Sequence, residues 1–153
     1  MSEDVGRNSD TTFIVFMIVL SFAISIGITG LISLNYGFQN LNAPIDASIV
    51  NGMLTATAIV FAFVTFEARE IEPYRVKFLL LMLPVIFLMT TGGYYFSQVM
   101  DPSIGHPTKL VLVVAMANFY FNILCSINAI MIENLEDEKK EDMKRRKENL
   151  KVA

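Results

Sequence analysis

The sequence is poor in the residues on which most enzyme chemistry depends. Its 153 residues include one cysteine and one histidine. Because Cys125 has no second cysteine to pair with, the chain cannot supply a Cys-x-x-Cys redox site. His106 and the nearby Asp101 are too few ligands for a zinc or haem site within one chain, and no glycine-rich phosphate loop is present. The sequence therefore predicts a protein that is not an enzyme and has no catalytic, metal-binding or cofactor-binding residues.

Charge is missing from four long stretches of the chain. Asp, Glu, Lys, Arg and His are all absent from Thr11–Leu34, Ala47–Phe66, Phe78–Met100 and Leu110–Ile132. This absence excludes a voltage sensor made of stacked arginines, and it argues against proton-coupled exchange through a carboxylate inside the membrane. Each stretch is nevertheless long enough to cross a bilayer, since about 20 helical residues span the roughly 30 Å hydrocarbon core. Together with 54% hydrophobic residues, these stretches predict an integral membrane protein.

The predicted fold is all-α, with four transmembrane helices at about 11–34, 47–66, 76–100 and 108–132. Short connections favour sequential helices that pack as antiparallel neighbours, which gives an up-down-up-down bundle. The domain organisation is then an N-terminal segment at 1–10, a transmembrane domain at 11–132 and a charged tail at 133–153. We expect the tail to continue the fourth helix, because it contains no Gly or Pro and pairs such as Glu141 and Arg145 stand four residues apart.

Positive charges predict the orientation of the bundle. Of the 12 Lys and Arg residues, only Lys109 falls in a connection that would lie outside; the rest precede the first span, separate the second from the third, or follow the fourth. Because Lys and Arg are retained on the cytoplasmic side, both termini are predicted to be cytoplasmic. The absence of a glycosylation sequon in the outer loops is compatible with a prokaryotic cell membrane.

Small and polar residues recur along one face of three of the predicted spans. The residues are Ser21, Ser25 and Thr29 in the first span, Asn51 and Thr55 in the second, and Asn118, Asn122 and Ser126 in the fourth. One interpretation is helix packing, because helices associate in lipid through close contact of small residues and interhelical hydrogen bonds. The other interpretation is an aqueous path lined by the fourth span in an oligomer, with Glu133 and Glu67 at its mouth.

The third span contains Pro84 and, further on, the sequence Thr90-Thr91-Gly92-Gly93. Proline removes a backbone hydrogen bond and kinks a helix, and the glycines could loosen it further. The sequence favours a simple kink, and the alternative is a broken helix that exposes backbone groups.

The predicted function is a small non-enzymatic membrane subunit that assembles through its small, polar helix faces with itself or with a larger membrane complex. The alternative is an oligomeric channel for ions or small solutes. The predicted partners are the lipid bilayer and other membrane subunits, with anionic lipid contacted by the basic cluster Lys144–Lys147 of the tail. No nucleic acid is expected as a partner.

Overall fold

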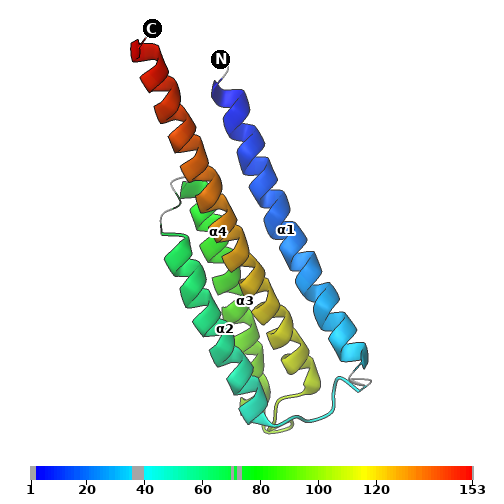
Figure 1. Cartoon of the computed structure of the whole chain (residues 1–153). Helices are drawn as coiled ribbons and strands as arrows, with labels where there is room; N and C mark the ends of the chain where they lie inside the picture. The colour runs from blue at the N-terminus through cyan, green and yellow to red at the C-terminus, as the bar shows by residue number, and fades with distance from the viewer. Residues whose placement is uncertain (1–2, 36–39, 70, 72–73, 153) are drawn as a thin grey trace.

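Four long helices make up the computed structural model, which describes residues 3–35, 40–69, 71 and 74–152. They are α1 (Glu3–Asn35), α2 (Ala47–Glu67), α3 (Tyr74–Met100) and α4 (Lys109–Val152) (Figure 1). Each contains a stretch long and apolar enough to cross a membrane: Thr12–Asn35, Ala47–Glu67, Val76–Met100 and Lys109–Arg145. The all-α prediction with four spans in a bundle is therefore confirmed. The two chain ends lie at the same end of the bundle (Figure 1), which we call the terminal end; the opposite end is the loop end.

Helix α4 is the centre of the bundle. It contacts α1, α2 and α3, whereas α1 and α2 do not contact each other within the described residues. The prediction that sequential helices pack as neighbours is therefore wrong for α1 and α2, because α4 lies where that contact was expected. In the most apolar stretch of α4, half of the residues are buried inside the bundle, whereas in the most apolar stretch of α2 only 17% are buried. Helix α1 therefore packs on α4, with a smaller contact to α3, and leaves much of its surface facing outward.

Backbone hydrogen bonds hold the loop end together. The N–H of Ile45 donates to the carbonyl of Pro107 at 2.9 Å, and the N–H of Lys109 donates to the carbonyl of Ala43 at 2.9 Å. The buried side chain of Gln98 accepts a hydrogen bond from the N–H of Thr108, also at 2.9 Å. These bonds satisfy backbone groups at the start of α4 and fix it beside the start of α2.

Asp46 caps the N-terminus of α2. Its carboxylate accepts a hydrogen bond from the backbone N–H of Ser48 at 2.8 Å. The hydrogen bonds from Ser48 hold the pKa of the Asp46 carboxyl below its ordinary value. The cap fixes where the span begins, since it satisfies one of the amides that a helix leaves without an internal partner.

The terminal end of the bundle is closed by apolar side chains. Ile71, in the turn between α2 and α3, is 2% exposed and belongs to the main hydrophobic cluster, which also contains Ala68, Leu80 and Ile132. A smaller cluster near the loop end is built around Val50 and Val111. Burial of these side chains removes apolar surface from any water at the two ends, where the spans leave the hydrocarbon.

The structure tests two predictions about how far the helices continue. Helix α3 runs without interruption from Tyr74 to Met100 through Pro84, so the broken-helix alternative is wrong. Helix α4 continues to Val152, so the predicted helical tail is confirmed. The Arg145 guanidinium lies 3.6 Å from the Glu141 carboxylate, four residues earlier. Helix α1 begins at Glu3 and so includes most of the segment predicted to precede the first span.

Candidate functional site

The polar residues of the spans are the candidate functional groups, and the structure divides them into three sets. In the first, between α1 and α4, Asn128 donates a hydrogen bond from its side-chain nitrogen to the hydroxyl oxygen of Ser21 at 2.9 Å. The Ser21 hydroxyl in turn donates to the carbonyl of Met17, also at 2.9 Å. Both polar side chains are at least 95% buried. This pair joins two helices that lie far apart in the sequence.

The rest of the predicted polar face of α1 is also buried. The Ser25 hydroxyl donates to the carbonyl of Phe22 at 2.7 Å, and the Thr29 hydroxyl donates to the carbonyl of Ser25 at 2.8 Å. Both side chains are almost fully enclosed. Hydroxyls that bond to their own helix present little polarity to a neighbour, so this face acts as a small, close-packing surface.

The second set is a chain of hydrogen bonds between α3 and α4. The Asn122 side-chain nitrogen donates to the side-chain oxygen of Asn118 at 2.9 Å. The Asn118 nitrogen donates to the hydroxyl of Thr91 at 3.3 Å, and this hydroxyl donates to the carbonyl of Phe87 at 2.7 Å. Both asparagines are 0% exposed. The side-chain oxygen of Asn122 has no hydrogen-bond partner within the described residues, and Ser126, one turn further on, is half-buried.

The third set lies on α2 and faces away from the bundle. The buried residues Val50, Thr57 and Val64 define the inner side of this helix. Its small and polar residues lie on the opposite side and are exposed, and we call them the α2 outer face: Asn51, Gly52, Thr55, Ala58 and Ala62. The predicted residues Asn51 and Thr55 therefore lie on a side of α2 that no other helix of the bundle covers within the described residues.

The two carboxylates predicted for a pore mouth lie at the terminal end. Glu67 ends α2 and Glu133 lies on α4, and both side chains are half-buried. Ala68 and Ile71, which follow Glu67 closely in the sequence, are buried. Within the described residues, no three His, Cys, Asp or Glu side chains come close enough to hold a metal ion.

Asn128 is one of the buried polar residues that the sequence pattern missed, and Thr57 and Gln98 are others. Asn128 lies ten residues after Asn118 and six after Asn122, which at 100° per residue places it about 80° around the helix from Asn118 and about 120° from Asn122. A search for polar residues along one helix face cannot find Asn128. A polar amide inside an uncharged span is nevertheless a signal that the sequence offers.

No protein family, curated protein or solved structure matches this chain.

Proposed function

We propose that this chain is a small, non-enzymatic subunit of a membrane assembly, and that it binds a second copy of itself or another membrane subunit through the α2 outer face. The observation that carries the proposal is the outward exposure of this face. The corresponding faces of α1 and α4 are buried within the bundle, whereas Asn51 and Thr55 are exposed.

The internal packing of the bundle gives no reason for small residues on this side of α2. A Cβ atom added at Gly52 would meet no atom within 4 Å apart from its chain neighbours and the nearby backbone of its own helix, so glycine is not needed there for close approach inside the bundle. Small residues on the outside of a span let a second helix approach closely. Close contact matters in a membrane because lipid tails are apolar, so the hydrophobic effect does not drive helices together there. The bulky Ile59 and Phe66 are exposed on the same side of α2, so close contact with another helix is suited to the part of this side formed by the small residues.

The Asn51 side chain adds a polar contribution to the same surface. It is exposed on the second turn of α2, and no described residue forms a hydrogen bond with its amide. An amide that meets lipid without a partner is costly, and a hydrogen bond across a helix interface in a membrane contributes about 0.6 kcal/mol, up to about 1.7. Contact with a partner helix would relieve this cost.

The channel alternative has weaker support. Asn118 and Asn122 bond to each other and to Thr91 between packed helices, which suits cohesion of the bundle better than the lining of an open path. The distribution of Lys and Arg supports an orientation with both termini and the α2–α3 turn in the cytoplasm. The same sequence is compatible with a prokaryotic cell membrane as the host membrane.

The test uses two matched glycines. Gly52 and Gly93 are both helical, exposed and free of neighbours around an added Cβ, but only Gly52 belongs to the α2 outer face. The proposal expects the wild-type chain, extracted in mild detergent, to have a mass by light scattering well above the 17.2 kDa of one copy. Gly52→Leu should reduce the mass to that of one copy with unchanged helix content, and Gly93→Leu should leave it unchanged. A monomeric wild type, or an assembly that tolerates Gly52→Leu, would overturn the proposal.

A further inference from the structure

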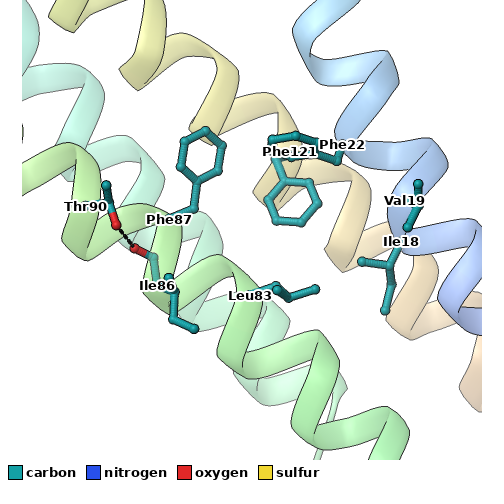
Figure 2. Close-up of a pocket in the computed structure, with 8 residues that line it drawn as sticks. All are labelled: Ile18, Val19, Phe22, Leu83, Ile86, Phe87, Thr90 and Phe121. Atoms are coloured by element: carbon teal, nitrogen blue, oxygen red, sulfur yellow. Dashed lines mark hydrogen bonds between the residues drawn. The ribbon is translucent and has the colours of Figure 1, made fainter.

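An apolar cleft of about 370 Å³ opens between α1 and α3. Ile18, Val19 and Phe22 of α1 form one wall, and Phe121 of α4 closes the bottom. The opposite wall is formed by Leu83, Ile86, Phe87 and Thr90 of α3, and Figure 2 shows these side chains gathered around the space. No residue of the α2 outer face lines the cleft.

The chemistry of the cleft excludes polar and charged ligands. No charged side chain lines it, and its one polar side chain, Thr90, donates its hydroxyl to the carbonyl of Ile86 at 2.7 Å (Figure 2). A polar ligand would lose its hydration there and gain no hydrogen bond in return. The volume nevertheless falls within the range of sites that hold small molecules, about 300–1,000 Å³.

The depth of the cleft places it among acyl chains. Ile18 lies six residues inside the start of the first span at Thr12, which is about 9 Å along a helix. Phe121 lies 11 residues before Ile132, where the uncharged part of α4 ends, or about 16 Å. On α3, Thr90 lies 14 residues after Val76, where that span begins, or about 21 Å. In a hydrocarbon core about 30 Å thick, the cleft thus extends from the half nearer the terminal end to a little past the midplane.

The width of the cleft excludes a partner helix. The rings of Phe22 and Phe87 join α1 to α3 with their centroids 5.7 Å apart, and Phe22 and Phe121 are 5.6 Å apart. A helix is about 10–12 Å across with its side chains and cannot pass between two helices that touch. A single hydrocarbon chain can enter from the side and would contact protein on three sides.

We propose that this cleft is a binding site for one acyl chain of a phospholipid from the leaflet at the terminal end. A lipid at the outer surface of the bundle touches protein on one side only, whereas a chain in the cleft gains dispersion contacts with α1, α3 and α4 together. The chain in the cleft therefore exchanges more slowly than the surrounding lipid. It also fills space between α1 and α3, which pack against each other only in part.

The test exploits the absence of tryptophan from the chain. Phe87→Trp and Ile86→Trp each place one fluorescent reporter in the cleft, and Met89→Trp places one on the same helix where the native side chain is 74% exposed. Each variant is reconstituted in vesicles of phosphatidylcholine that carries bromine on its acyl chains, because bromine quenches tryptophan fluorescence. These vesicles are then fused with an excess of unbrominated vesicles, which dilutes the brominated lipid around the protein.

The proposal expects fluorescence to recover severalfold more slowly for the two cleft reporters than for Met89→Trp. Native mass spectrometry of the wild-type chain should show one retained phospholipid, which Leu83→Trp removes by filling the cleft and Met89→Trp leaves bound. Equal recovery rates at all three positions would overturn the proposal. So would a retained molecule with the mass of a free fatty acid or another lipid-soluble compound. Neither result bears on assembly through α2, which the two glycine variants test separately.

Discussion

Removal of the hydrogen bond between Ser21 and Asn128 should loosen α1 from the bundle. This side-chain hydrogen bond joins α1 to α4, with its atoms 2.9 Å apart. Helix α1 has no contact with α2 and only a small one with α3. Its position therefore depends on the interface with α4, where Ile14 and Ile18 join the main hydrophobic cluster.

The expected magnitude follows from burial and from membrane energetics. Ser21→Ala leaves the Asn128 nitrogen, in a side chain 5% exposed, without its acceptor, which should cost about 1–3 kcal/mol. Asn128→Leu removes both the hydrogen bond and the side-chain nitrogen that needs an acceptor. It should therefore lower the free energy of unfolding by less than Ser21→Ala, which leaves an amide unpaired. In a double-mutant cycle the coupling between the two positions should be about 0.6 kcal/mol and no more than about 1.7 kcal/mol.

The assay is reversible unfolding by a denaturing detergent, followed by circular dichroism, for the wild type, both single variants and the double variant. Thr90→Ala serves as control, because the Thr90 hydroxyl bonds only to its own helix; the free energy of unfolding should change by about 0.5 kcal/mol or less. A coupling of zero, or a Ser21→Ala variant as stable as the control, would refute the assignment of this bond as a link between helices.

Three further predictions concern the cap, the core and the topology. Asp46→Ala should lower the thermal midpoint at pH 7, and the difference from wild type should shrink as the pH falls below about 4 and through the depressed folded pKa, because the hydrogen bonds from Ser48 favour the ionised carboxylate. An equal difference at pH 7 and about pH 2 would contradict this. Leu80→Ala removes a side chain that is 0% exposed and should cost about 2–5 kcal/mol of unfolding free energy, whereas a cost under 1 kcal/mol would contradict its place in the core. In a Cys125→Ser background, a cysteine in place of the exposed His106 should react with a membrane-impermeant thiol reagent from outside intact cells, and one in place of Glu141 should react only after lysis; the reverse would contradict the predicted orientation.

The four helices could be predicted because their signal is simple. Charge-free stretches of membrane-spanning length leave the backbone no alternative to internal hydrogen bonding, so they form helices. The start of α2 carried a local signal, the capping residue Asp46. The helical tail followed from charges at i and i+4, of which the pair Glu141 and Arg145 is present in the structure.

The arrangement of the helices could not be predicted in the same way. Periodicity along α2 indicated that Asn51 and Thr55 share a face, but it carries no information on whether that face meets another helix or lipid. Short connections predicted that α1 and α2 would be neighbours, and this was wrong because a connection fixes which helix ends are near each other but not which helix becomes central; in the structure that helix is α4. Asn128 was missed for a related reason, since it serves a different neighbour from Asn118 and lies on a different side of α4.

The most direct test of assembly through α2 is photo-crosslinking in the native membrane. A benzophenone is attached to a single cysteine introduced by Thr55→Cys, or by Met89→Cys on the exposed side of α3, with the fully buried Cys125 replaced by serine. We predict that Thr55→Cys yields adducts with protein, either a second copy or another membrane subunit, and that Met89→Cys yields adducts with lipid alone. Adducts with lipid alone from Thr55→Cys would contradict the account.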